Sequence, residues 1–394
     1  MIDFRLEKKG DAISVVGGGH EIVFEMSDAC SSIENDAIFA AWAVLPIGMR
    51  LNRRLIIDGF GDDVAAANAT SLSRTWSTWL PARFSPVDLE FKHQAAPRST
   101  SDVDLVLYSG GVDSCYNIMR RHRAGKRQAI VTMHGSGFED EAFKTLVAKT
   151  AGFAEAYATK RMTVRTDIRR VYRDLGMTSD VTHGFALAAT LFLMRSNYCS
   201  GSISADYSRT QEFLVFPWGT NSVTNAFFES TDFRMETRDL DVTRAEKLEL
   251  ISGDEIALRS LSFCTDRAAR PHNCGRCTKC VRTKAMFLAA LGDIPDIFID
   301  RTMGCGIFDS INLARRSEVA FAVDLIAMAR QRGTANLIPE LDNLERRVRN
   351  SDPSPPGKRG ILKRSGKFLG ALVGAIVHKL TGSPGVDAIA PLLA

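Results

Sequence analysis

Between residues 103 and 205 the chain alternates between short apolar runs and longer segments in which apolar residues recur at helical spacing. The short runs predict strands at 103–108, 129–133, 155–158 and 202–205. The longer segments predict helices at 113–124, 139–150 and 183–196. This alternation is typical of an α/β fold, a parallel sheet with helices on both faces. In such a sheet, ligands bind at the carboxyl ends of the strands.

The first 98 residues carry a different pattern. Apolar runs at 12–16 and 21–25 flank Gly17-Gly18-Gly19, and another run lies at 54–58. These runs predict a β-hairpin and a third strand. The glycines lack GxGxxG spacing and a following helix, which favours a hairpin turn over a dinucleotide-binding loop. A helix is predicted at 64–80, with its tryptophans in a core, so we expect residues 1–98 to form an α+β N-terminal module.

After residue 305 the pattern becomes helical. Helices are predicted at 313–330 and 338–348, and the Pro- and Ser-rich stretch 351–357 predicts a linker. We therefore expect the α/β domain to span 99–305 and a helical C-terminal extension to span 306–394. Residues 369–380 are apolar, follow a basic stretch and are too few to span a bilayer. Docking onto the protein's own body, a partner or a membrane surface are the open alternatives.

The composition is that of an ordinary globular protein. Of 394 residues, 45% are apolar and 24% are charged, which argues against a disordered chain or a membrane protein. The net charge of +4 is too small to indicate a nucleic-acid partner. The first nine residues lack the order of a secretory signal, so we expect a cytoplasmic protein. The oligomeric state, including a homo-oligomer, stays open.

The strongest chemical signal is a strand that runs directly into Ser109-Gly110-Gly111-Val112-Asp113-Ser114 and then into a helix. Two glycines allow close backbone approach to an anion, the helix start presents N–H groups, and two serines add hydroxyl donors. The loop lacks the lysine of a GxxxxGK[ST] phosphate loop, which disfavours kinase-like or GTPase chemistry. The alternative is an ordinary strand-to-helix turn.

Four cysteines cluster near the end of the α/β region. Cys274, Cys277 and Cys280 are separated by two residues each, and Cys264 lies ten positions upstream. This spacing favours a metal site over a disulfide framework, and four thiolates suit a structural zinc ion in a knuckle loop. An iron–sulfur cluster and free thiols are the alternatives.

The hexapeptide resembles the SGGxDS motif of the PP-loop (N-type ATP pyrophosphatase) superfamily. That resemblance implies a Rossmann-like sheet of the adenine nucleotide α-hydrolase type, with the β- and γ-phosphates of ATP bound by residues 109–114. It also implies that Asp113 helps to place Mg²⁺ and that the α-phosphorus stays open to attack by a substrate oxygen. His134, at the end of the second predicted strand, is expected near the nucleotide; a turn histidine is the alternative.

Further motifs resemble the 7-cyano-7-deazaguanine synthase family, whose members convert a 7-carboxy-7-deazaguanine to the nitrile with ATP and ammonia. They are Ser204-Ala205-Asp206-Tyr207-Ser208, Val242-Thr243-Arg244-Ala245-Glu246 and the cysteine loop, and the resemblance covers residues 102–292. The segment 209–221 departs from the family pattern, so the substrate stays open. The extra terminal regions resemble those of enlarged synthase-like proteins, including proteins of bacterial antiphage systems, in which a deazaguanine is joined to a protein amine.

The resemblance implies an AMP-forming ligase. A carboxylate attacks ATP, pyrophosphate leaves into the loop, and ammonia or a protein amine displaces AMP, with Asp113, Ser114 and Arg244 as catalytic residues. Asp206 and Tyr207 are expected to bind a 7-deazaguanine-like substrate, since a carboxylate accepts from ring N–H groups. For Arg244 the alternative is a solvated helix start, and for Asp206 a helix or turn cap.

Two other functions remain open. A tRNA-modifying PP-loop enzyme would need a basic surface for RNA, which the small net charge does not indicate. A non-catalytic protein that keeps the fold for partner binding would not need the intact phosphate loop.

Overall fold

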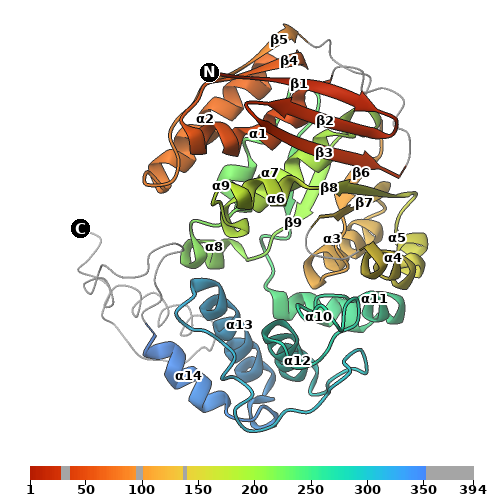
Figure 1. Cartoon of the computed structure of the whole chain (residues 1–394). Helices are drawn as coiled ribbons and strands as arrows, with labels where there is room; N and C mark the ends of the chain where they lie inside the picture. The colour runs from red at the N-terminus through yellow and green to blue at the C-terminus, as the bar shows by residue number, and fades with distance from the viewer. Residues whose placement is uncertain (28–35, 95–100, 136–139, 352–394) are drawn as a thin grey trace.

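The computed structural model, which describes residues 1–27, 36–94, 101–135 and 140–351, contains one ten-stranded sheet (Figure 1). Its strand order is β10-β9-β6-β7-β8-β3-β2-β1-β4-β5. The strands are β1 (Ile2–Lys9), β2 (Ala12–Gly17), β3 (His20–Met26), β4 (Leu55–Gly61), β5 (Leu89–Gln94), β6 (Asp104–Leu107), β7 (Gln128–His134), β8 (Arg161–Thr166), β9 (Gly201–Ser204) and β10 (Met235–Arg238). The β1–β2, β2–β3 and β3–β8 pairs are antiparallel and the others are parallel, so the sheet is mostly parallel.

Helices alternate with the parallel strands along the sequence, and further helices follow the last strand, β10. They are α1 (Ile38–Leu51), α2 (Asp63–Trp79), α3 (Val112–Arg123), α4 (Asp140–Lys149), α5 (Ala151–Tyr157), α6 (Ile168–Asp174), α7 (Ser179–Phe192), α8 (Arg209–Val215), α9 (Ser222–Asn225), α10 (Arg244–Ser252), α11 (Glu255–Ser260), α12 (Thr278–Leu291), α13 (Arg316–Arg332) and α14 (Leu341–Arg349). Two short 3₁₀ helices span Arg195–Asn197 and Ala335–Leu337.

Two hydrophobic cores lie on opposite faces of the parallel strands. On β6, Leu105 and Leu107 belong to the core that contains α1 and α7. Val106, between them, belongs to the second core, which contains α3, α10, α12 and α13. Because side chains alternate along a strand, burial on both faces requires the continuous apolar run that the sequence has. The predicted α/β class with a largely parallel sheet is thus confirmed.

The N-terminal residues add strands to this sheet. The hairpin is confirmed, since β2 pairs antiparallel with β3 around the three glycines, and the predicted third strand and helix are β4 and α2. Trp76 is fully buried, as expected for a core residue. β3 pairs with β8, so hydrogen bonds join the N-terminal strands to the parallel ones. The domain boundaries at residues 98 and 305 stay predictions.

One predicted strand is wrong. Residues 155–158 belong largely to helix α5, and the strand at this point of the chain is β8, which begins at Arg161. The helix places Phe153 on the ring of Tyr108, with 5.0 Å between centroids. A short apolar run does not distinguish a strand from a buried helical segment, and here the segment is helical.

The C-terminal helices pack beside α3. α10 contacts α3 and α12, and α12 contacts α13, which contacts α14 (Figure 1). The predicted helices at 313–330 and 338–348 are confirmed as α13 and α14. All but the first residue of the predicted linker, and the whole apolar stretch 369–380, lie outside the described residues. Within the described part of the chain, every helix is too short or too polar to cross a membrane.

A buried arginine ties the N-terminal segment to the rest of the fold. Arg195 Nε donates to Asp36 Oδ2 at 2.8 Å, and its guanidinium also bonds Asp232. The side chains of Arg195 and Asp36 are 1% and 2% exposed. Loss of one partner of a buried ion pair leaves an uncompensated charge and costs about 3–5 kcal/mol.

We therefore expect Asp36→Ala to lower the free energy of unfolding by about 3–5 kcal/mol in urea denaturation. Asp58→Ala, which removes the exposed partner of Lys92, is the matched control and should leave the urea midpoint unchanged. Equal midpoints for both variants would contradict a structural role for the buried pair.

Candidate active site

The predicted phosphate loop lies where β6 ends and α3 begins. Gly110 has φ +73°, a left-handed conformation that favours glycine. The Ser109 and Ser114 Oγ atoms are 3.2 Å apart, and the Gly111 N–H donates to Ser109 Oγ at 3.3 Å. The first N–H groups of α3 have no hydrogen-bond partner within the helix. They therefore give the helix start a partial positive charge beside this loop. The loop can accept an anion with its hydroxyls and helix start.

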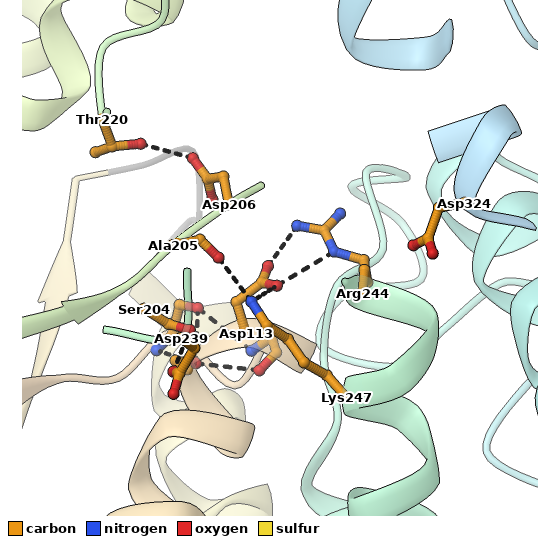
Figure 2. Close-up of polar contacts among 12 residues, drawn as sticks. Asp113, Ser204, Ala205, Asp206, Thr220, Asp239, Arg244, Lys247 and Asp324 are labelled. Atoms are coloured by element: carbon orange, nitrogen blue, oxygen red, sulfur yellow. Dashed lines mark hydrogen bonds and ion pairs between the residues drawn. The ribbon is translucent and has the colours of Figure 1, made fainter. Parts of the chain in front are cut away.

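Asp113, in the first turn of α3, is held by two cations from α10 (Figure 2). Arg244 Nε lies 3.4 Å from Asp113 Oδ1, and the same guanidinium bonds Asp113 Oδ2. Lys247 Nζ lies 3.0 Å from Asp113 Oδ1 and donates to the Ala205 carbonyl oxygen at 2.7 Å. Two positive side chains thus lie beside the loop, and Lys247 also connects it to the end of β9.

Lys247 is a site residue that the sequence analysis missed. It is 1% exposed, which is rare for a lysine and requires bonded partners such as Asp113 and Ala205. The signal that could have found it is its spacing, because residues three apart lie on the same helical face, and Lys247 follows Arg244 by three positions.

The start of α10 is fixed by its own sequence and by α13. Thr243 and Glu246 form a capping box, in which each side chain accepts from the other residue's backbone N–H. Asp324 of α13 accepts from the Ala245 N–H at 3.0 Å. Arg244 and Lys247 therefore project from a helix whose first turn is tied at two points. Burial raises the pKa of Asp324 to about 6, against a partial opposing effect of its hydrogen bonds.

The raised pKa of Asp324 makes stability depend on pH. Between the unfolded pKa, about 4, and the folded pKa of about 6, the folded state binds the proton more tightly, so stability falls as pH rises through this window. From pH 4.5 to 7.5 the loss is about 2 kcal/mol. We expect Asp324→Asn to remove this pH dependence, because an amide does not titrate in this range. The amide oxygen can still accept from the Ala245 N–H, so the helix start should be kept. Denaturant titrations of variant and parent at both pH values measure the change in the free energy of unfolding. An equal change in variant and parent would contradict the role of Asp324.

A pocket of about 190 Å³ lies at the carboxyl ends of β6, β7 and β9. Ser109, Asp113 and Ser114 line it from the loop side, and Asp206 lines it from the segment after β9. Arg244 reaches this pocket through its ion pair with Asp113. The fold thus brings together residues that are about 100 positions apart in the sequence, at the edge of the sheet where ligands are expected.

Asp206 is bonded to three side chains at one oxygen. Its Oδ2 accepts from Trp218 Nε1 at 2.8 Å and Thr220 Oγ1 at 2.7 Å, and it lies 3.5 Å from His183 Nε2. Burial acts to raise the pKa of Asp206, but bonding to His183 and Trp218 outweighs it and holds the pKa below its usual range. Within the described chain no hydrogen bond uses Oδ1 of Asp206, which leaves one acceptor for a ligand.

Other predicted site residues lie away from the pocket lining. Tyr207 is 3% exposed and packs between the rings of Trp218 and Phe321, at centroid distances of 5.6 and 5.2 Å. His134 stacks on Phe143 at 4.2 Å, and its Nε2 lies 3.6 Å from Asp140. Neither Tyr207 nor His134 is among the residues that line this pocket, and their expected roles stay predictions.

The four clustered cysteines meet at one point. The Sγ atoms of Cys264, Cys274, Cys277 and Cys280 lie within 4.8 Å of one another. The Cys264–Cys277 and Cys274–Cys280 Sγ distances are 3.8 and 3.9 Å. A tetrahedron with Zn–S bonds of ~2.3 Å has S···S edges of ~3.8 Å. This cluster could hold a metal ion such as zinc.

The loop around the cysteines needs a glycine. Gly275 has φ +80°, and a Cβ there would lie 1.9 Å from the Asp300 carbonyl oxygen. The N–H groups of Arg276 and Cys277 both donate to Cys274 Sγ at 3.3 Å. Such bonds stabilise a thiolate, the form that binds a metal ion.

Comparisons with protein-family models, with curated proteins and with solved structures find no match. Function is therefore inferred from the arrangement of the residues: a loop suited to phosphates, two cations beside it, and a small pocket lined by the half-buried carboxylate of Asp206.

Proposed function

We propose that the protein is an ATP-dependent, AMP-forming carbon–nitrogen ligase of the PP-loop type. In this proposal it adenylates the carboxylate of a 7-deazaguanine-like substrate for attack by ammonia or a protein amine. The observation that supports it most is the pairing of Asp113 with Arg244 and Lys247 directly beside the Ser109–Ser114 loop. The sheet is proposed to be of the Rossmann-like adenine nucleotide α-hydrolase type, supported by the loop after β6 in the strand order β9-β6-β7-β8.

The loop is the proposed binding site for the β- and γ-phosphates of ATP. Backbone N–H groups at the start of α3 and the hydroxyls of Ser109 and Ser114 supply hydrogen-bond donors. Arg244 and Lys247 supply positive charge that offsets the negative charge of leaving pyrophosphate. Both oxygens of Asp113 already bond these cations, so the carboxylate does not fit a free Mg²⁺ ligand. Magnesium is proposed to arrive with ATP, as MgATP.

The proposed chemistry has two displacements. A carboxylate oxygen of the substrate attacks the α-phosphorus of ATP, the bond from that phosphorus to the bridging oxygen breaks, and pyrophosphate leaves with the electron pair. The product is an acyl-adenylate. The amine nitrogen then attacks the acyl carbon, AMP leaves, and the amine loses a proton, which yields an amide. Positioning and charge neutralisation provide the rate enhancement, with no covalent enzyme intermediate.

The small pocket is the proposed site for the deazaguanine-like acid. Oδ1 of Asp206 suits the N–H donors of a purine-like ring edge. A role in bacterial antiphage defence is part of this proposal and is supported by the resemblance of the sequence to enlarged synthase-like proteins. The cysteine cluster is proposed to hold a structural zinc ion, because four sulfur ligands leave no open position for catalysis.

Product analysis tests the proposal. The purified protein is mixed with MgATP, 7-carboxy-7-deazaguanine and ammonia, and nucleotides are separated by chromatography. We expect AMP and pyrophosphate only when the acid is present. AMP formation that depends on tRNA instead would favour a tRNA-modifying enzyme, and failure to bind ATP would favour a non-catalytic partner-binding protein.

A further inference from the structure

One cationic side chain in the pocket has no bonding partner among the residues that the structure describes. Arg169, at the second residue of α6, lines the pocket with the phosphate loop and Asp206. Its Nε atom is buried and has no hydrogen-bond partner, and among the described residues its guanidinium makes no ion pair. Burial lowers the pKa of Arg169, with no neighbouring acid to offset the effect. A half-buried guanidinium without a partner is costly in a folded protein.

The neighbouring Arg170 has the environment usual for an arginine, exposed and paired with acidic side chains. Arg170, next in the same helix, is exposed and bonds both Asp167 and Asp174. Among the described residues, the pocket carboxylates Asp113 and Asp206 make no ion pair with Arg169: Asp113 bonds Arg244 and Lys247, and Asp206 bonds Trp218 and Thr220 through Oδ2. The pocket therefore presents an unused positive charge, and an anionic group of a ligand is the partner that is missing.

The position of Arg169 separates it from the proposed pyrophosphate site. α6 follows β8, and β8 is two strands from β6, where the loop lies. Neighbouring strands are about 4.8 Å apart, so the two strand ends are about 10 Å apart. Arg244 and Lys247 already provide the positive charge beside the loop. Arg169 thus enters the pocket from a different strand end than the loop proposed to receive the leaving group.

We propose that Arg169 binds the carboxylate of the acid that is adenylated, and that this pocket takes a small, planar carboxylic acid. This inference rests on the proposed ligase function. The volume of about 190 Å³ equals about six water molecules, which suits one compact ring system and not a whole nucleotide. Met133, Leu187 and Ile203 add apolar walls for the faces of a ring.

The guanidinium fork matches the two oxygens of a carboxylate. Held in this way, the carboxylate keeps one oxygen oriented for attack on the α-phosphorus. Transfer of AMP to that oxygen removes the negative charge, which weakens the bond to Arg169. The acyl carbon then becomes accessible to the amine.

Calorimetric binding to the full-length protein tests the inference with three ligands: 7-carboxy-7-deazaguanine, its neutral 7-cyano analogue, and an ATP analogue with a methylene group between the α- and β-phosphorus. We expect Arg169→Gln to weaken binding of the acid by about 10- to 100-fold. Binding of the neutral and ATP analogues should stay unchanged. Arg169→Lys should recover only part of the loss, because it keeps the charge without the fork.

Arg170→Gln is the matched control and should bind all three ligands as the parent does. Thermal melting of each variant checks folding, which should persist because Arg169 has no described partner to lose. If the parent adenylates the acid and Arg169→Gln binds it equally well, this inference alone is overturned. Weaker binding of the ATP analogue with unchanged acid binding would assign Arg169 to a phosphate and also overturn it. If the parent neither binds the acid nor forms AMP, the proposed function fails, and this inference fails with it.

Discussion

Replacing Lys247 by methionine is expected to reduce kcat/KM for AMP formation by about 10²- to 10³-fold, the usual cost of losing one preorganised group at a developing charge. Lys247 Nζ lies 3.0 Å from Asp113 and 2.7 Å from the Ala205 carbonyl, beside the loop proposed to receive pyrophosphate. Methionine fills much of the same volume without the charge. Asp113 keeps Arg244 as a partner in this variant, so no buried carboxylate is left unpaired.

Initial rates of AMP release, with acid and ammonia saturating and MgATP varied, measure this effect. Lys144→Met is the matched control, because Lys144 is an exposed lysine on the surface of α4 whose ion pair is with Glu141. The control should keep the parent rate. A Lys247→Met rate within a factor of about three of the parent would contradict a role for Lys247 in charge neutralisation.

Replacing Cys280 by alanine is expected to abolish retention of a metal ion and to lower the melting temperature by several degrees. Its sulfur lies 3.9 Å from Cys274 Sγ, and the residue is in the first turn of α12, so the cluster anchors this helix to the preceding loop. Structural zinc contributes about 10 kcal/mol or more in small zinc domains. Loss of a third of that, about 3 kcal/mol, would lower Tm by about 4 °C in a chain of 394 residues, whose unfolding entropy is about 0.8 kcal/mol/K.

Elemental analysis of purified protein and thermal melting measure the two outcomes. Cys305→Ser is the matched control, since Cys305 is exposed and lies outside the cluster. The control should retain the metal ion and the parent Tm. Unchanged metal content and Tm in Cys280→Ala would show that the cluster holds no structural ion.

The sequence predicts those parts of the site whose residues are contiguous in the chain. The loop from Ser109 to Ser114 and the three cysteines from Cys274 to Cys280 are each contiguous, so spacing alone indicates their geometry. Arg169 and Trp218 are different, because Arg169 lines the pocket and Trp218 bonds Asp206 of the pocket, each from a separate segment of the chain. Only tertiary packing brings them there, and neither carries a motif.

The elements that sequence patterns miss have physical causes as well. Residues 38 to 49 of α1 are all buried, so this helix lacks the polar face that gives a helical period, and no helix was predicted there. At residues 155–158 a short apolar run is compatible with either structure, and in the fold the segment is helical and its Phe153 packs on the ring of Tyr108. The strands β6 and β7, by contrast, are mostly apolar runs between clear breaks, and both agree with the predicted strands, as does the short strand β9.

Transfer of an oxygen label tests the central claim most directly. The acid is prepared with ¹⁸O in its carboxylate and incubated with the protein, MgATP and ammonia, and the AMP is analysed by mass spectrometry. Attack of the carboxylate on the α-phosphorus, followed by displacement of AMP, moves one labelled oxygen into the phosphate of AMP, and this is the expected result. AMP that forms without label would show that water or another group attacks ATP, and would contradict a carboxylate-adenylating ligase.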